Sequence, residues 1–321
     1  IVGLNDDDYK KSTSSLMAIF EDAEEKKAIS DMILFSGTGR FENVFGQPLH
    51  RFLKPEVIDL LQNAVTTESN VYACDQFIVY MKNSSIIFIE TSKELDDIDR
   101  RLLDIFCANV SVAYENSHLN HELCKTQNEI ILTFGQTAEF RNRDKGQHVC
   151  RVAEIAKHLA LLGGMSVDEA EILKLAAPLH DIGKIAVPET ILLKPEKLTP
   201  EEFEIMKSHT TVGYEMFNHS KRKILKAAAI VAYEHQEKWD GSGYPRGLSG
   251  EHIHSFGRIT AVADVYDALS TKRPYKAAYP QEKCFSILSE GRGRHFDPRV
   301  LDAFFDNIDE VIKVHHDYAD P

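Results

Sequence analysis

The chain has 321 residues, of which 43% are hydrophobic, so it is long enough to bury the cores of two domains. Its 37 lysine and arginine residues are outnumbered by 50 aspartate and glutamate residues, which leaves a net charge of -13. That charge repels polyanions and argues against duplex nucleic acid as a partner. A small anionic ligand could still bind where positive side chains or metal ions gather.

The cysteines are odd in number, scattered, and never form a CxxC pair; they are Cys74, Cys107, Cys124, Cys150 and Cys284. This pattern argues against a disulfide framework or a zinc ribbon and predicts a reducing, cytoplasmic location. No run of about 18 apolar residues occurs, and the N-terminus lacks a signal-peptide pattern, so we predict neither a membrane span nor export. Because the chain opens with Ile1 instead of methionine, an upstream segment is expected.

The first part of the chain, up to about Ser92, mixes strand and helix signals. β-branched and aromatic runs predict strands at Met32–Phe35, Phe77–Met81 and Ile86–Ile89, and the polar residues between the last two predict a hairpin. A helical pattern is expected at Ser14–Lys27. These elements together predict an α+β domain.

A long helix is predicted from Asp96 to about Phe134. Its apolar residues recur at roughly helical spacing, as at Ile98, Leu102, Ile105, Phe106, Val110, Ala113, Leu119 and Leu123. Such a helix suits a connection between domains. It can also pair with its own copy, which predicts a homodimer.

From Gln136 onward the strand signals fade. Ser166 with Glu169, and Thr199 with Glu202, have the spacing of capping boxes at helix starts. We therefore predict an all-α domain over residues 126–321, preceded by the α+β domain and its connecting helix over residues 1–125.

Four places in this second half combine histidine and acidic residues in helical contexts. They are Asp144 with His148, His180 and Asp181 with Lys184 one turn later, His209, and Asp264 in the apolar stretch "AVADVYDAL". A lone carboxylate in so apolar a helix is costly to bury. Helical bundles take metal ligands from inward helix faces, and imidazole with carboxylate suits Fe, Mn, Ni or Zn better than Ca or Mg.

Spacing alone does not identify a ligand. Glu154 with His158, and Glu215 with His219, repeat the spacing of four residues found at Asp144 and His148, and we interpret them as exposed contacts on helix faces. The run His315–Asp317 is another histidine and acidic cluster, which we predict to face solvent in a polar tail.

Four motifs in order carry a resemblance to a known family: "HDIGK" from His180, "HTTVGYEMF" from His209, "HQEKWDGSGYP" from His235, and "ADVYDALSTKRPYK" from Ala263. With this order and spacing, the stretch from about Gln136 to Pro298 resembles the HD-GYP family, bacterial phosphodiesterases of cyclic dinucleotides within the HD hydrolase superfamily. Residues 1 to about 125 more loosely resemble GAF-like sensory domains. The resemblance implies a GAF-like α+β domain before an HD-type helical bundle, with an upstream receiver domain and a sensor kinase as partners.

The resemblance also implies a set of metal ligands: His148, His180, Asp181, His209, His235 and Asp264. Asp181 would bridge two divalent transition metal ions of the Fe, Mn or Ni kind, which activate water to open the cyclic dinucleotide to a linear one. Catalytic roles are implied for Asp181 and for Lys184, which would neutralise a phosphate oxygen. Tyr244, Arg273 and Lys276 are implied substrate contacts.

Two departures from the family pattern bear on the number of metals. The family usually has a histidine pair where this sequence has His235 and Gln236. Some similar members hold three metals and have a glutamate at the position of Asp144. The shorter Asp144, a candidate additional ligand, and the neutral Gln236 argue against a third metal.

The sequence leaves three alternatives open. Cyclic di-GMP and 3′3′-cyclic GMP-AMP are both candidate substrates, because pocket shape and not the metal motif distinguishes bases. A degenerate receptor or partner-recruiting module is disfavoured by the complete set of six ligands. A phosphohydrolase of mononucleotides is disfavoured by the GYP loop and "RPYK".

Overall fold

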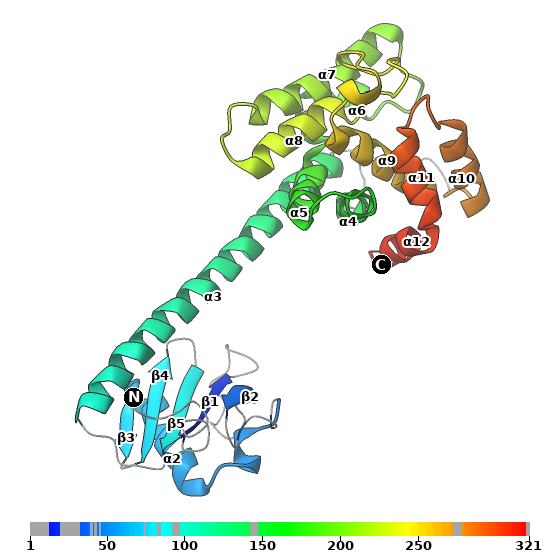
Figure 1. Ribbon diagram of the computed structural model, residues 1–321. Coiled ribbons are helices and arrows are strands. Elements are labelled where there is room, and N and C mark those ends of the chain that lie inside the picture. The colour runs from blue at the N-terminus through cyan, green and yellow to red at the C-terminus, as the bar shows by residue number, and fades with distance from the viewer. Residues whose placement is uncertain are drawn as a thin grey trace. The chain divides into compact units, whose positions relative to one another are not determined.

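The computed structural model describes residues 13–19, 33–38, 41, 44, 46–73, 75–81, 85–91, 97–141, 147–271 and 278–318 (Figure 1). The chain divides into two compact units, Ile1–Leu123 and Cys124–Pro321. The long helix α3 (Asp97–Phe140) begins in the first unit and ends in the second. It covers the predicted connecting helix and continues six residues beyond Phe134.

The first unit is built on a five-stranded antiparallel sheet with the order β2-β1-β5-β4-β3. Its strands are β1 (Thr13–Ile19), β2 (Ile33–Thr38), β3 (Val71–Ala73), β4 (Gln76–Met81) and β5 (Ser85–Thr91). The predicted hairpin is confirmed, since β4 pairs with β5 and places Val79 opposite Ile87.

The predicted helix Ser14–Lys27 is wrong where the structure describes it. Residues 13–19 form β1, which pairs with β5 on one side and β2 on the other, for example Leu16 with Phe88 and Gly37. Hydrogen bonding to two neighbouring strands outweighs a weak helical spacing in a segment that begins with the poor helix formers Thr13 and Ser14. Residues 20–27 lie outside the described residues.

Side chains along β4 and β5 point alternately to the two faces of this sheet, and helices cover both faces. Ile78 of β4 and Phe88 of β5 pack against α2 (Pro55–Thr67), which buries Leu61, and against the short turn η3 (Leu49–Arg51). Their neighbours Phe77, Val79 and Met81 point the other way and pack with Cys107 of α3. The period of two in a strand thus divides one apolar run between two helix-covered faces.

The second unit holds helices and, within its described ranges, no strand longer than an isolated bridge. Its helices are α4 (Gln147–Leu162), α5 (Val167–Ala176), α6 (Glu189–Leu192), α7 (Pro200–Phe217), α8 (Lys223–Glu234), α9 (Ser255–Ser270), α10 (Gln281–Glu290), α11 (Pro298–Asp306) and α12 (Ile308–Asp317), with the short turns η4 (Ala177–Leu179), η5 (Ile182–Ala186) and η6 (Gly250–His252). One core runs through the bundle and includes Ile155 of α4, Val231 of α8 and Val262 of α9. None of the described helices combines the length and the hydropathy that a membrane span requires.

The two predicted capping boxes are confirmed. The side chain of Ser166 accepts from the backbone of Glu169 at the start of α5, and that of Thr199 accepts from Glu202 at the start of α7; each glutamate bonds back to its cap. These caps satisfy backbone N–H groups that would otherwise lack partners. They fix where two helices of the bundle begin.

Gly183 lets η5 approach α7 very closely. A Cβ atom at this position would overlap the backbone oxygen of His209 and lie 2.7 Å from the backbone nitrogen of Gly213. Only glycine therefore allows the turn that follows Asp181 to lie directly on the helix that carries His209.

We predict that Gly183→Ala separates η5 from α7 and lowers the free energy of unfolding by about 1–3 kcal/mol, the usual cost of overpacking. Gly163→Ala is the control, because its Cβ would meet no atom closer than 3.2 Å and a smaller loss is expected. Denaturant unfolding of both variants measures the difference. Equal stability of Gly183→Ala and the parent would show that the close approach is not required.

Candidate metal centre

The structure brings all six sequence-predicted ligands to one place in the second unit. His148 lies in the first turn of α4, His180 and Asp181 join η4 to η5, and His209 lies within α7. His235 follows α8, and Asp264 lies in α9. The four histidines are each 2% exposed or less, so the cluster is buried.

The Asp181 carboxylate lies between two groups of histidines. Its Oδ1 is 3.3 Å from Nε2 of His209 and 3.6 Å from Nε2 of His235, and its Oδ2 is 3.2 Å from Nε2 of His180. On the other side, Oδ1 of Asp264 is 3.4 Å from Nε2 of His148. One carboxylate therefore faces ligands on both sides, which is the arrangement that a bridging ligand needs.

Three histidines bond their outer ring nitrogen to the backbone. Nδ1 of His180 is 2.8 Å from the carbonyl oxygen of Ala177. The corresponding distances are 2.7 Å from His209 to Met206 and 3.0 Å from His235 to Val231. A carbonyl oxygen only accepts, so Nδ1 carries the proton and Nε2 of the neutral ring keeps its lone pair. All three Nε2 lone pairs then face the Asp181 carboxylate.

His148 is held by a carboxylate instead. Its Nδ1 lies 2.6 Å from Oδ2 of Asp267, which is 1% exposed and also accepts from the guanidinium of Arg151. Burial alone would raise the pKa of Asp267, but hydrogen bonds from His148 and His315 hold it well below its usual range. An ionised carboxylate behind a ligand histidine orients the ring and makes Nε2 a better metal ligand.

Asp267 and Arg151 were not predicted from the sequence. Asp267 follows Asp264 by three residues, and Arg151 follows His148 by three residues, so each lies on the same helix face as a predicted ligand. That spacing is the signal that could have identified them. The prediction that His315 faces solvent is wrong, because its side chain is only 15% exposed and its Nε2 lies 3.3 Å from Oδ1 of Asp267.

The donors fit transition metal ions. Among the described residues, Nε2 of His180 and Oδ1 of Asp181 are buried and have no hydrogen-bond partner. Lone pairs of nitrogen and oxygen 3.2–3.6 Å apart repel unless a cation lies between them, and a buried unpaired carboxylate oxygen is costly. Ligand atoms lie within 4.8 Å of one another in two sets, Asp181 with His209 and His235, and Glu139 with His148 and His180.

The histidines on the two sides of Asp181 have pKa values shifted in opposite directions. Burial lowers the pKa of His180, but the neighbouring Asp181 carboxylate outweighs burial and raises it to about 9. Burial lowers the pKa of His209 to about 4. A proton on His180 and a metal ion there would compete for the same lone pair, whereas His209 is already neutral at pH 7 and ready to bind.

Lys184 and Glu139 extend the cluster. The ammonium of Lys184 donates to Oδ2 of Asp181 and lies 3.6 Å from Oε1 of Glu139, which is 3% exposed. Burial lowers the pKa of Lys184, but the two carboxylates outweigh this effect and raise it above its usual range. Glu139 was not predicted from the sequence, since nothing in the helical pattern of α3 distinguishes it from a surface glutamate.

The residue that directly follows α3 also supports the chain that carries Lys184. Arg141 donates to the backbone oxygens of Lys184 at 3.0 Å and Val187 at 3.1 Å, and to that of Ile185. Five donors on one guanidinium can hold several carbonyls at once. The lysine is therefore fixed both through its ammonium and through its backbone.

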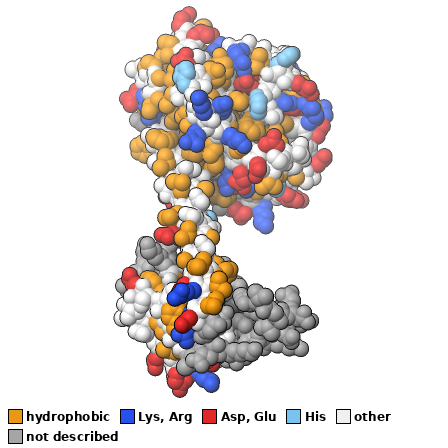
Figure 2. Space-filling model, turned by 60° about the vertical axis from the view of Figure 1, so that its left-hand side comes forward, with side chains coloured by type: hydrophobic (Ala, Val, Ile, Leu, Met, Phe, Trp, Pro, Cys, Tyr) orange, Lys and Arg blue, Asp and Glu red, His pale blue; other side chains and the backbone are white. Residues whose placement is uncertain are grey.

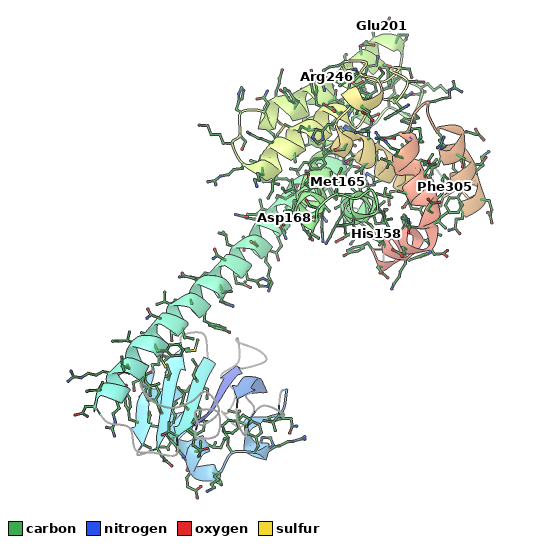
Figure 3. The ribbon with its side chains drawn as sticks, in the orientation of Figure 1. His158, Met165, Asp168, Glu201, Arg246 and Phe305 are labelled. Atoms are coloured by element: carbon green, nitrogen blue, oxygen red, sulfur yellow. The ribbon has the colours of Figure 1, made fainter. Side chains whose placement is uncertain are left out.

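The "GSGYP" loop folds around a buried glutamate. Glu237 is 2% exposed and accepts from the backbone nitrogens of Arg246 at 2.8 Å and Leu248 at 2.9 Å. Arg246, labelled in Figure 3, pairs with Glu234 and lies over the ring of Tyr233. These contacts explain why this stretch contains the charged residues Glu234, Glu237 and Arg246.

Tyr244 of this loop lies beside the cluster. Its ring centroid is 6.3 Å from that of His209 and 6.1 Å from that of Phe203, and its backbone nitrogen donates to Gln236. Burial is the main reason that the pKa of Tyr244 is raised above its usual range, so its hydroxyl stays protonated. The loop thus places a neutral hydroxyl next to the donors.

Three predicted residues lie outside the described residues: Asp144, Arg273 and Lys276. Their predicted roles stay predictions. Of the pairs with the same spacing as Asp144 and His148, Glu215 and His219 are exposed, as predicted. His158, labelled in Figure 3, is only partly buried and lies 3.0 Å from Glu310, away from the cluster.

Two family models match the chain. The model described as "HD domain" matches residues 133–300, slightly more than half of the 321 residues. The model described as a domain of unknown function (DUF3369) matches residues 9–123. The first match contains all six predicted metal ligands.

Several curated proteins are similar to this chain. The "3'3'-cGAMP-specific phosphodiesterase 2" of Vibrio cholerae is 42% identical over 230 residues, which cover 72% of this chain and 44% of that protein. The "Cyclic di-GMP phosphodiesterase response regulator RpfG" of Xanthomonas campestris is 42% identical, with 57% and 48% covered. A "Cyclic di-GMP phosphodiesterase" of Thermotoga maritima is 43% identical, with 58% and 51% covered. The chain spans about half the length of these relatives.

We predict that Asp267→Asn weakens metal binding by about 10–100-fold, the usual effect of removing a carboxylate behind a ligand histidine. The neutral amide leaves the buried Arg151 without its counter-charge and holds His148 less firmly. Asp302→Asn is the matched control, because Asp302 also pairs with an arginine, Arg292, but both are about half exposed.

Competition with a chelator, followed by metal analysis, measures the affinity of both variants. The control should bind metal as the parent does. Unchanged affinity in Asp267→Asn would mean that His148 does not depend on this carboxylate.

Proposed function

This chain belongs to the HD domain family, and from that premise we propose that its helical unit is a metal-dependent phosphodiesterase that opens a cyclic dinucleotide to a linear one. The observation that carries the proposal is the buried Asp181 carboxylate facing three histidine lone pairs. A site of this kind holds divalent cations, and divalent cations favour reactions at phosphate esters. The names of the similar proteins support the class of substrate.

The proposed site holds two ions of the Fe, Mn or Ni kind. His209 and His235 would bind one and His148, His180 and Asp264 the other, with Asp181 shared between them. When bound, the ions would supply Lewis acidity and a water of lowered pKa. The described donors account for these two ions without Asp144.

The chain's own residues prepare the site for a phosphate. Lys184 keeps a positive charge beside Asp181, so a phosphate oxygen that approaches meets an ammonium as well as the ions. Tyr244 offers a protonated hydroxyl on the side of His209. Arg273 and Lys276, beyond the end of α9, are the further substrate contacts that we propose.

The two ions, together with Lys184, would supply local positive charge for a ligand with two phosphates in a chain whose net charge is -13. Both cyclic di-GMP and 3′3′-cyclic GMP-AMP remain candidates. One relative at 42% identity is named for 3′3′-cyclic GMP-AMP. Two others, at 42% and 43% identity, are named for cyclic di-GMP. The ligand set around the ions does not read bases, so it favours neither.

A receptor without turnover is the alternative from another class. Gln236 is the feature that favours it, because an amide stands where the family usually has a second histidine. The complete set of six donors and the partly buried Lys184 favour the enzyme.

For the first unit we propose a GAF-like sensory domain. An antiparallel sheet covered by α2 on one face and α3 on the other supports a compact sensing module. An upstream receiver domain and a sensor kinase belong to the same proposal and are supported by the relative named as a response regulator. A cytoplasmic location is supported by the four described cysteines, which form no disulfide with one another.

We predict that Asp181→Ala lowers kcat/KM for the preferred dinucleotide by more than about 100-fold, since even a partner behind a ligand accounts for 10–100-fold. Products are separated by chromatography after incubation with cyclic di-GMP and 3′3′-cyclic GMP-AMP in parallel, with Mn(II) or Fe(II). Asp168→Ala, at an exposed aspartate of α5 labelled in Figure 3, is the control and should retain full activity.

Metal content and helicity are measured on the same samples. Loss of both metal and turnover in Asp181→Ala, with helicity retained, supports the proposed role. Turnover at the parent rate would defeat it, and binding of a dinucleotide by the parent without turnover would favour the receptor.

Gln236→His tests the number of metals. If Gln236 occupies a ligand position, the variant should hold one more ion per chain than the parent, because imidazole binds transition metals far better than an amide. Metal analysis of the purified, reloaded proteins measures the difference. An unchanged metal content would show that this position does not face the ions.

A further inference from the structure

The helix α3 (Asp97–Phe140) carries an exposed apolar stripe that repeats every seven residues. One set of positions is Leu102, Asn109, Asn116, Leu123, Ile130 and Thr137, and the other is Ile105, Val112, Leu119, Thr126, Thr133 and Phe140. All of these residues are exposed. Figure 2 shows hydrophobic side chains along the helix. In heptad notation the first set are the a positions and the second set the d positions of a coiled coil.

Within this chain, the two units pack against other residues of α3 than those of the stripe. In the first unit, Leu103, Cys107 and Tyr114 pack with the sheet. In the second unit, Ile131 packs on the helical core, and a Cβ on Gly135 would overlap the backbone oxygen of Pro178. The a and d positions therefore serve neither core. Leu119 and Leu123 are 57% and 55% exposed. A continuous exposed apolar surface of this extent is unusual unless another surface covers it.

We propose that a second copy of this chain covers the stripe, and that the two α3 helices form a parallel, in-register, two-stranded coiled coil. The average spacing of 3.5 residues favours a left-handed supercoil of helices over packing on a globular surface. This proposal is independent of the proposed hydrolysis, because it uses no residue of the metal cluster.

The polar residues of the stripe determine the register. Asn109 and Asn116 stand at consecutive a positions, where each would face its own copy in a parallel, in-register pair and the amides could bond to each other. Any shift of register would place an asparagine against Leu102 or Leu123 or a d residue and leave a buried amide unpaired. Two such layers disfavour other registers.

The charges beside the stripe determine the orientation. Glu115, Glu122 and Glu129 occupy the g positions. In a parallel pair, Glu115 faces Asn120, Glu122 faces Gln127 and Glu129 faces Phe134 of the other copy, and all three partners are neutral. In an antiparallel pair g positions face g positions, so glutamates would face glutamates and repel.

The same glutamates limit the number of strands. Leu102 at an a position and Ile105 at a d position, taken alone, favour more than two strands. A bundle of four helices would bury the g positions as well, and removing several carboxylates from water is costly. Nearer the end of the helix, Thr133 and Thr137 bond their hydroxyls to their own helix at 2.7 Å, which leaves their methyl groups for the seam.

The mass of the full chain in solution tests the association. Light scattering should give twice the chain mass of 36.3 kDa at micromolar concentration. A single chain mass would overturn the proposal, and a mass of four chains would overturn the two-stranded form.

Disulfide cross-linking tests the orientation. In a Cys124→Ser background, Val112→Cys and Leu119→Cys should each cross-link to the same residue of the other copy on oxidation, because both are d positions. An antiparallel pair cannot bring both residues to their own copies, since they lie about 10 Å apart along the helix. Cross-linking at one or neither would overturn the parallel arrangement. Ser117→Cys, exposed but off the stripe, is the control and should stay uncross-linked.

Charged substitutions test the stripe itself. Leu119→Glu with Leu123→Glu should halve the mass, whereas Ser117→Glu with His121→Glu, which are exposed off the stripe, should leave it unchanged. Metal content should be the same in all forms and shows that the second unit is folded. A dimer that survives the first pair of changes would place the interface elsewhere.

Discussion

The site depends on what each histidine does with its outer ring nitrogen. In His180 and His209 the acceptor is the carbonyl three residues earlier, and in His235 it is the carbonyl four residues earlier. These are carbonyls of the same helical turn, so the local backbone both places the ring and selects its tautomer. The Nε2 atoms then point inward at Asp181, where a metal ion, or at His180 a proton, must lie between the nitrogen and the carboxylate.

That constraint explains several other features of the second unit. Gly183 is needed because the turn after Asp181 must lie directly on α7, where His209 is held. At His148 the partner of Nδ1 is instead the buried Asp267, which also accepts from Arg151. Lys184 balances part of the carboxylate charge and is itself fixed by Glu139 and Arg141. The second unit thus contains one buried cluster of carboxylates and histidine nitrogens that suits divalent cations.

The sequence predicts the bundle, its caps and the six donors because each depends on residues close together or on a motif with fixed spacing. It does not predict Glu139, since only the fold brings the end of α3 to Lys184. The environment of His315 depends in the same way on the packing of α12 near Asp267. The helix predicted at Ser14 fails for a related reason, because strand neighbours distant in sequence decide the structure of that segment.

Anomalous scattering from crystals loaded with Mn(II) would locate the bound ions. We expect two peaks per chain, one beside Nε2 of His209 and His235 and the other beside Nε2 of His148 and His180, each within reach of Asp181. Peaks at Nδ1 atoms, or no peak within this cluster at saturating metal, would contradict this expectation.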